Sequence, residues 1–310
     1  MQKRKNIRLI ISLVVVLIAI LGLQLFKPKS GNLNVDKKLF QLDPQQEITD
    51  VYLQGEGISN HLQFKNGQWY VNDTLLLDQS MRDVFFSVLT QLEIRRPVAK
   101  SSQDTIAGYL LNNGIQTTIS YGNKTIKRYY VGGDSNKDIS WIMDSEEQIP
   151  YEVHIPGYQT YTAGIFKVPA NDWRSRFVID VNFALIKSIK LSYPNKEDNI
   201  ELVSTKDFFK ITNTSADSTK IADFLDNLAY LQADKFLSDD EISGGYDSLI
   251  KNNKVFARIE IVMSYGENPR LTFYEPLADN HYILSKISDG SVCVFDFNRV
   301  EGVFIRRGEL

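Results

Sequence analysis

The residue types that most often bind metals or act as nucleophiles are few and widely spaced in this chain. His61, His154 and His281 each stand without a second potential ligand at helical or hairpin spacing. Zinc sites draw on clustered Cys, His and carboxylate ligands, so this spacing indicates no zinc site. Cys293, the one cysteine, lies in an apolar pattern at residues 292–295 that is typical of a buried strand. A buried thiol behaves as a small hydrophobic group, and a reactive thiolate needs an electropositive, partly exposed setting.

Sequence motifs for catalysis or cofactor binding are also absent. The chain has no G-x-S-x-G elbow, P-loop or glycine-rich dinucleotide fingerprint. The glycine pairs at residues 132–133 and 244–245 indicate turns. Ser238 and Glu241 have the spacing of a helix capping box, which explains that acidic cluster better than a metal site or an acid–base pair does. We therefore expect no enzyme activity, no catalytic or metal-binding residue and no cofactor.

One segment, residues 156–176, concentrates aromatic and charged side chains between two longer patterned regions. Its candidate interaction residues are Tyr158, Tyr161, Trp173, Arg174 and Arg176. Aromatic and arginine side chains dominate binding hot spots, so this connector is a candidate surface for a partner, a peptide or a glycan. The alternative is that its aromatic rings fill the seam between two folded units and its charges orient them.

An unbroken apolar run spans residues 9–26 and is followed by a polar linker. About 20 apolar residues are needed for a helix to cross a bilayer, and this run is near the short end of that range. Basic residues precede it without acidic ones, which favours a cytoplasmic N-terminus. A cleaved signal peptide is the alternative, but no small-residue cleavage site follows the run. We predict an uncleaved anchor that contacts membrane lipid through residues 9–26.

The chain beyond the anchor is acidic. Six of the 35 Lys and Arg residues lie in residues 1–29, which hold no Asp or Glu, so the remainder carries 29 basic and 38 acidic side chains, a formal charge of −9. Nucleic-acid binding needs clustered cations on phosphates, so we expect no nucleic-acid partner. A single cysteine also excludes a framework of intrachain disulfides.

Hydrophobic periodicity predicts an α+β fold outside the membrane. In the first half it predicts a helix over residues 77–92 that begins at Asp78, and a short helical piece at 104–111. The predicted strands are residues 48–54, 62–64, 68–71, 116–121, 125–131, 139–143 and 151–155. Each half then reads as a mostly antiparallel sheet with one covering helix.

The second half repeats this order, which favours an internal duplication. The Ser-Tyr-Gly triplet at residues 120–122 recurs at 264–266, and the same separation relates Tyr130 to Tyr274. Helix positions also match, namely Phe85 with Phe224, Leu89 with Leu228 and Leu92 with Leu231. The predicted organisation is a basic head and transmembrane anchor at residues 1–29, a first repeat unit at 30–165 and a second at 166–310.

The basic head, the single anchor, the Tyr-Tyr-Val-Gly-Gly turn at residues 129–133 and the Trp-Arg-Ser-Arg connector at 173–176 together resemble domain of unknown function 4340. Members of that family resemble bacterial envelope proteins found beside ABC-transporter components of the gliding-motility type. The resemblance implies an accessory role at a transporter and supplies no catalytic residues.

These observations predict a single-pass protein of the bacterial inner membrane with its C-terminal domain in the periplasm. We expect a non-catalytic accessory or interaction subunit with a membrane protein as its partner, and the resemblance implies that the partner belongs to an ABC-type transport complex. A glycan- or peptide-binding module is the first alternative. A cell-envelope hydrolase with a site between the repeats is the second, and a His–Asp contact in a deep pocket would favour it.

Overall fold

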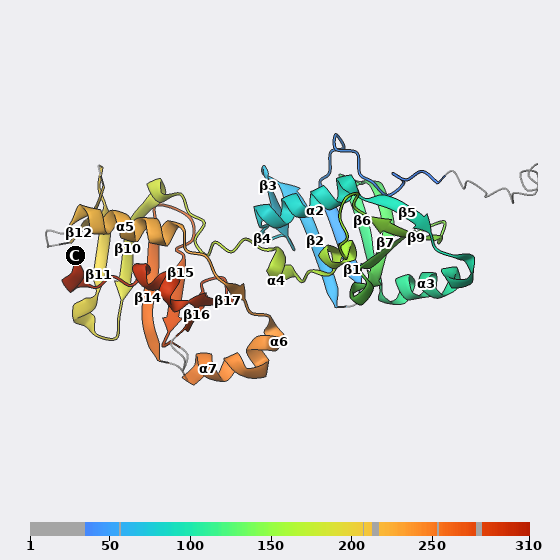
Figure 1. The fold of residues 1–310 in the computed structure, drawn as a ribbon. Helices are drawn as coiled ribbons and strands as arrows, with labels where there is room; N and C mark the ends of the chain where they lie inside the picture. Colours follow the sequence, from blue (N-terminus) through green and yellow to red (C-terminus); the bar gives the residue numbers. More distant parts are fainter. Residues whose placement is uncertain (1–34, 56, 207, 213–216, 253, 277–280) are drawn as a thin grey trace, which may run out of the picture.

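The structure is a computed structural model that describes residues 35–310 except 56, 207, 213–216, 253 and 277–280 (Figure 1). The predicted anchor at residues 9–26 lies outside the described residues. Within the described part, no helix combines the length and apolar composition needed to cross a bilayer. Two antiparallel sheets, each with its own helices, make up the fold, so the chain is a mixed α and β protein as the periodicity predicts.

The first sheet has nine strands in the order β4-β3-β2-β1-β6-β7-β8-β9-β5. Its strands are β1 (Asp50–Gly55), β2 (Ile58–Lys65), β3 (Gln68–Val71), β4 (Leu75–Leu76), β5 (Glu93–Pro97), β6 (Ile115–Tyr121), β7 (Lys124–Asp134), β8 (Ile139–Asp144) and β9 (Pro150–His154). They reproduce the seven strands predicted for this half, and β4 and β5 are additions at the two edges.

Helix α2 (Gln79–Gln91) covers one face of this sheet, as the spacing of its apolar residues predicts. Asp78 caps it, because the side chain accepts a hydrogen bond from the Met81 N–H at 3.0 Å and satisfies one free donor of the first turn. Phe85 and Leu89 are fully buried in the first core, against Val51 and Leu62 of the sheet.

A second helix, α3 (Lys100–Asn113), is longer than the piece predicted at residues 104–111 and packs against β7, β8 and β9. Its Tyr109 ring stands edge-on to Trp141, and its Leu110 lies against Gly132, where a Cβ would come within 2.8 Å of the leucine. A Cβ at that position would therefore force the Leu110 side chain to shift, so glycine favours the close approach of helix and strand. The prediction of one covering helix per sheet is therefore wrong for the first sheet.

The second sheet has eight strands in the order β12-β11-β10-β14-β15-β16-β17-β13. Its strands are β10 (Ile186–Ser192), β11 (Ile200–Ser204), β12 (Phe209–Ile211), β13 (Lys235–Phe236), β14 (Val255–Met263), β15 (Arg270–Tyr274), β16 (Tyr282–Ile287) and β17 (Val292–Asp296). Helix α5 (Ser218–Ala229), capped by Asp217, buries Phe224 and Leu228 in the second core.

Shorter helices complete the second unit. The predicted capping box is present, since Ser238 and Glu241 bond to each other's backbone N–H at the start of α6 (Asp239–Glu241). The helix α7 (Asp247–Asn252) follows after a kink, and α8 (Phe297–Val300) lies near the end of the chain. A small apolar cluster that includes Leu237, Leu284 and Ile242 lies between the α6–α7 segment and the sheet.

The two sheets share one strand order once β4 is set aside. The order β3-β2-β1-β6-β7-β8-β9-β5 corresponds strand for strand to β12-β11-β10-β14-β15-β16-β17-β13. Thr117 faces Tyr129 across β6 and β7, and Ile259 faces Leu271 across β14 and β15, the strand pair at the same position in the second sheet. The residue equivalences predicted from the Ser-Tyr-Gly triplets and from Tyr130 with Tyr274 stay predictions.

The two cores divide later in the chain than the predicted boundary after residue 165. Phe166 and Trp173 belong to the first core, whereas Ile179 belongs to the second. The segment from Thr162 to Trp173, with the short helix α4 (Ala170–Trp173), therefore completes the first unit. Here "first unit" means the first sheet with residues 35–173, and "second unit" means residues 178–310.

Candidate functional site at the junction of the two units

Residues 174–178, which link the units, are hydrogen-bonded to both. On the first unit, Leu77 and Arg174 form an antiparallel bridge, and the Ser175 N–H donates to the Leu76 carbonyl at 2.6 Å. On the second unit, the Ala233 N–H donates to the Arg176 carbonyl at 2.8 Å. The connection is therefore a short tied segment, and Figure 1 shows it as the narrow passage between the two sheets.

Trp173 is not an interaction residue. Its side chain is fully buried, stands edge-on to Phe85 at 5.2 Å and donates its indole N–H to the Val168 carbonyl at 3.0 Å. It fills the first core beneath α2 rather than a seam between units, so both predicted roles for this ring are wrong. An indole that is buried this way stabilises the unit through packing and one satisfied donor.

Arg174 leaves the first unit at the next position. Its guanidinium lies over the Phe236 ring, 3.6 Å from the centroid, and donates to the Ser291 hydroxyl at 2.9 Å. Asp289 lies at 3.5 Å as an ion-pair partner. Only 11% of the side chain is exposed. Desolvation lowers the pKa of this guanidinium, and the Asp289 carboxylate opposes that shift.

Three cavities adjoin one another around this segment, with volumes of about 650, 600 and 590 Å³. The first and third share Asn171, Asp172, Arg174, Lys235 and Phe236. The second and third share Asp78, Ser80, Arg176 and Gln232. We call the three together the junction groove, because residues of both units line it.

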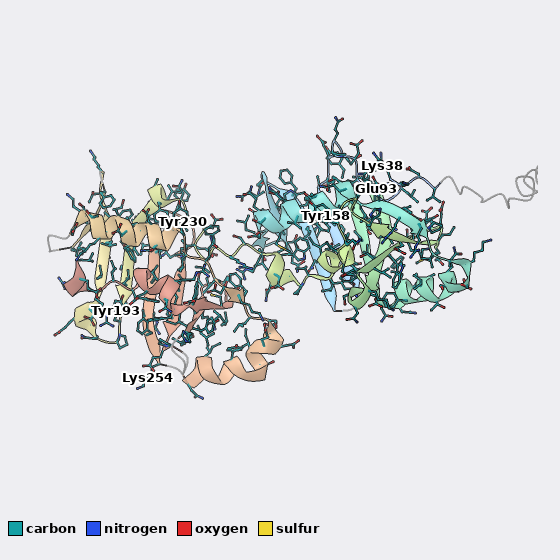
Figure 2. The ribbon with its side chains drawn as sticks, in the orientation of Figure 1. Lys38, Glu93, Tyr158, Tyr193, Tyr230 and Lys254 are labelled. Atoms are coloured by element: carbon teal, nitrogen blue, oxygen red, sulfur yellow. The ribbon has the colours of Figure 1, made fainter. Side chains whose placement is uncertain are left out.

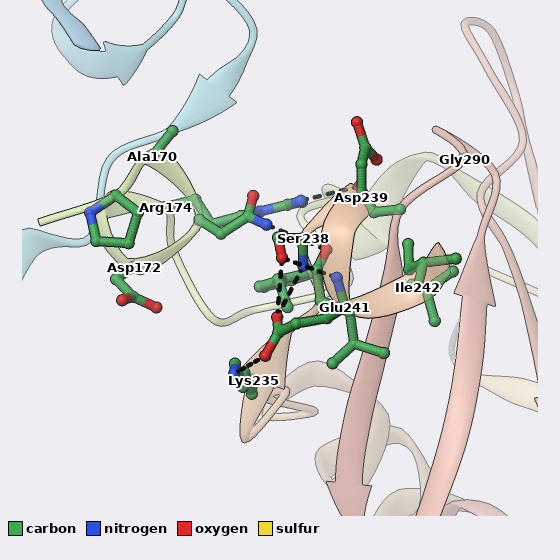
Figure 3. A pocket seen from close by; sticks show the side chains of 15 residues that line it. Ala170, Asp172, Arg174, Lys235, Ser238, Asp239, Glu241, Ile242 and Gly290 are labelled. Atoms are coloured by element: carbon green, nitrogen blue, oxygen red, sulfur yellow. Dashed lines mark hydrogen bonds and ion pairs between the residues drawn. The ribbon is translucent and has the colours of Figure 1, made fainter. Parts of the chain in front are cut away.

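Three ionisable side chains of the junction groove, Arg174, Lys235 and Glu241, have hydrogen-bond or ion-pair partners (Figure 3). Lys235 forms an ion pair with Glu241, whose carboxylate also accepts from the Ser238 N–H at 3.0 Å. The hydrogen bond with Glu241 raises the pKa of Lys235, and the same bond lowers the pKa of Glu241. Arg176 is exposed, and its guanidinium has no hydrogen-bond or ion-pair partner among the described residues.

Tyr158 and Tyr161 lie away from the junction groove. Tyr158 is 64% exposed and lines a separate cavity of about 480 Å³ with Glu152 and His154 (Figure 2). Tyr161 is half-buried against Gly133, and burial raises the pKa of its hydroxyl. The five predicted interaction residues thus separate: Arg174 and Arg176 line the groove, the two tyrosines lie elsewhere, and Trp173 is core.

Strand pairing creates one contact that the sequence analysis missed. His61 on β2 faces Tyr52 on β1, and their rings stack at 4.2 Å, while the His61 Nε2 lies 2.7 Å from an Asp50 carboxylate oxygen. The predicted strands at residues 48–54 and 62–64 held part of the signal, but His61 lies just before the second of them, and the observed strand β2 extends to include it. Asp50 also accepts hydrogen bonds from Thr49 and Gln63, so its carboxylate is already occupied.

Cys293 is fully buried, as the strand pattern predicts, and burial raises the pKa of its thiol. In the described part of the chain, no three His, Cys, Asp or Glu side chains converge closely enough to hold a metal ion. No family model, curated protein or solved structure matches the chain. The resemblance to domain of unknown function 4340 therefore stays a prediction.

Proposed function

We propose that this protein is a non-catalytic, membrane-anchored accessory subunit of the bacterial envelope and that the junction groove binds a membrane-protein partner. The junction groove carries this proposal, because it is the concave surface to which both units contribute. Concave, partly apolar surfaces with a few fixed polar groups are typical binding sites. The resemblance to transporter-associated envelope proteins makes a component of an ABC-type transport complex the first partner to test.

The charges in the groove favour recognition over acid–base catalysis. A general acid or base works best with a pKa near the operating pH. Here the pKa of Lys235 is raised and that of Glu241 is lowered, so both groups move away from neutrality. Arg176, exposed and unpaired within the described residues, is the group best placed to meet an acidic side chain of a partner.

The membrane topology is part of this proposal. The apolar run at residues 9–26 and its basic flank support a single-pass anchor with the C-terminal domain in the periplasm. A reporter that fluoresces only in the cytoplasm should stay dark when fused after Leu310. A bright fusion, or a mature chain that begins beyond Phe26, would contradict this topology.

We also infer that the two units arose by duplication. Their common strand order supports this origin, as do the matched helices, in which Asp78 and Asp217 are the caps and Phe85 and Phe224 are the buried rings. Val51 and Leu62 of the first sheet correspond to Ile189 and Leu202 of the second, and each pair faces the helix of its own unit.

A binding module for a glycan or peptide is the second candidate function. The exposed Tyr158 ring beside a cavity that also holds the buried carboxylate of Glu152 favours it. Arg96 donates to that carboxylate at 2.7 Å, which fixes its position. The hydrolase alternative has less support: the His61–Asp50 contact lies on a sheet face rather than in the groove between the units, and the carboxylate is already occupied by other donors.

Photo-crosslinking in intact membranes tests the groove. A photoreactive residue at Asp239, an exposed position that lines the groove, should capture a membrane protein, and Arg176→Glu should reduce the adduct several-fold. The same probe at Asn112, exposed on α3, serves as the control and should capture no such protein. Equal adducts at both positions, or an adduct unaffected by Arg176→Glu, would contradict the groove as the interface. Loss of the adduct on Tyr158→Ala instead would favour the second candidate.

A further inference from the structure

Arg174 belongs to one unit through its backbone and to the other through its side chain. Its backbone bridges Leu77 at the start of α2, next to the buried Trp173. Its guanidinium lies between Phe236 on β13 and the turn that contains Ser291. Arg174 thus joins the two separate hydrophobic cores. Its backbone is hydrogen-bonded to the first unit, and its nearly enclosed guanidinium lies in the second.

The second unit holds that guanidinium by three different contacts. The Phe236 ring supplies a cation–π face, Ser291 accepts a hydrogen bond, and Asp289 supplies the opposite charge. Arginine fits such a place because its planar group can stack and donate hydrogen bonds at the same time, which lysine cannot. Nearby, the Asn171 amide donates to the Leu237 carbonyl at 3.1 Å and adds a second contact from the first unit to the second.

The segment that follows is tied to the first unit as far as Ser175 and to the second unit from Arg176 onward, so free rotation is confined to the backbone bonds between these two residues. Arg176 and Phe177 are exposed, and the two cores share no residue across residues 174–178. Interfaces between domains of one chain allow relative motion unless they are large and hydrophobic. The orientation of the units therefore depends on a few specific side-chain contacts.

We propose that Arg174 is a lock that fixes the second unit against the first, and that releasing it lets the units rotate about the backbone bonds between Ser175 and Arg176 and changes the shape of the junction groove. In the locked state the groove is lined by both units, because Arg174 and Asn171 bring Lys235 and Phe236 beside Asp172. The lock is independent of whether the groove binds a partner.

Distances between spin labels in the full-length chain, reconstituted in lipid nanodiscs, test the lock. Cysteine substitutions at Asn112 on α3 and Asp226 on α5 place one label on each unit at exposed helix positions, while Cys293 is too buried to be labelled in the folded protein. The wild-type chain should give one narrow distance distribution. Arg174→Ala should broaden it at least two-fold, and Arg174→Lys, which keeps the charge but loses the stacking plane, should give an intermediate width.

Two controls separate rotation of the units from unfolding. Arg176→Ala removes an arginine two positions away that has no side-chain partner among the described residues, and it should leave the distribution narrow. A label pair at Ser87 and Asn112, both in the first unit, should stay narrow in every variant. A wild-type width in both Arg174 variants, or equal broadening by Arg176→Ala, would overturn the lock. If Arg174→Ala also broadens the distance distribution of the label pair within the first unit, that variant has disturbed the fold. The lock is then judged from Arg174→Lys, which must broaden the distribution between the units and leave the one within the first unit narrow.

Discussion

The two units share a strand order but differ in what they bury at one matched place. Thr117 and Tyr129 face each other across β6 and β7, and both hydroxyls are buried without a hydrogen-bond partner among the described residues. Across β14 and β15, the strand pair at the same position in the second sheet, Ile259 faces Leu271. A buried hydroxyl without a hydrogen-bond partner lowers the free energy of unfolding. The same strand order thus contains a polar pair in the first unit and an apolar pair in the second.

Their open sheet faces differ as well. The second sheet carries charges that neutralise one another, with Lys190 at 3.4 Å from Glu201 and Arg270 at 2.8 Å from Glu260. The first sheet carries the Asp50–His61–Tyr52 cluster instead. The comparison teaches that strand order is shared while side-chain chemistry on both faces is specific to each unit.

Removing the Trp173 ring should give the largest loss of stability, and the loss should be confined to the first unit. Trp173→Ala should lower the free energy of unfolding of the first unit by about 3–5 kcal/mol, because it empties a fully enclosed site beside Phe85. Hydrogen exchange followed by mass spectrometry should show lost protection in α2 but not in α5. The exposed Tyr158→Ala is the control and should cost less than about 0.5 kcal/mol. Equal loss in both units would show that they unfold as one.

The helix caps should respond alike in the two units. The Asp78 side chain accepts from the Met81 N–H at 3.0 Å, and that of Asp217 accepts from the Thr219 N–H at 2.9 Å. Asp78→Ala and Asp217→Ala should therefore each cost about 1 kcal/mol, measured by urea denaturation. The Asn variants keep an acceptor and should cost much less. A cost confined to one helix would weaken the correspondence between α2 and α5.

How far the sequence predicts this fold depends on the range of the interaction. Asp78 and the spacing of Phe85 and Leu89 are local signals, and they place α2 correctly. The predicted equivalence of Tyr130 with Tyr274 is not a local signal of that kind, because a strand shifted by two residues keeps every side chain on the same face. Local hydrophobic patterns cannot detect such a shift.

The candidate site was harder to predict, because its geometry depends on tertiary contacts. Trp173 and Arg174 are adjacent in the sequence, yet one is buried in the first core and the other extends to the second unit. Nothing in the local composition distinguishes the two destinations. The Asp50–His61 contact needed the strand predicted at residues 62–64 to begin earlier, since pairing across a short turn is a local rule once both strands are placed.

The change in stability on replacing a buried tyrosine by phenylalanine should have opposite signs in the two units. Tyr129→Phe removes an unpaired hydroxyl and should leave the first unit unchanged or more stable by up to about 1 kcal/mol. Tyr193→Phe in the second unit removes a hydroxyl that donates to the Ile305 carbonyl at 2.8 Å, and it should cost about 1 kcal/mol. Denaturation midpoints of the two variants measure the difference. A loss of stability in Tyr129→Phe would mean that its hydroxyl has a partner.

Acid should lower the stability of the first unit in part through protonation of Asp50. Partial desolvation raises the pKa of Asp50, but hydrogen bonds from Thr49, His61 and Gln63 outweigh it and lower the pKa overall. Because the folded pKa is lowered, this stabilisation is present above the ordinary aspartate pKa of about 3.9 and is lost as the pH falls through the folded value. Asp50→Asn should flatten the fall in unfolding midpoint of the first unit between about pH 5 and pH 3. An unchanged profile would exclude Asp50 as its source.

The enclosure of Cys293 has a consequence for following the second unit in time. The chain has one sulfhydryl, on β17, and it lies inside the second sheet with its sulfur 3.6 Å from the Ser285 carbonyl. An alkylating reagent can reach it only when that sheet opens, so at high reagent concentration the reaction rate equals the opening rate. Alkylation of Cys293 in the native chain thus reports the opening rate of the second unit without an engineered probe. The first unit has no cysteine and no such probe.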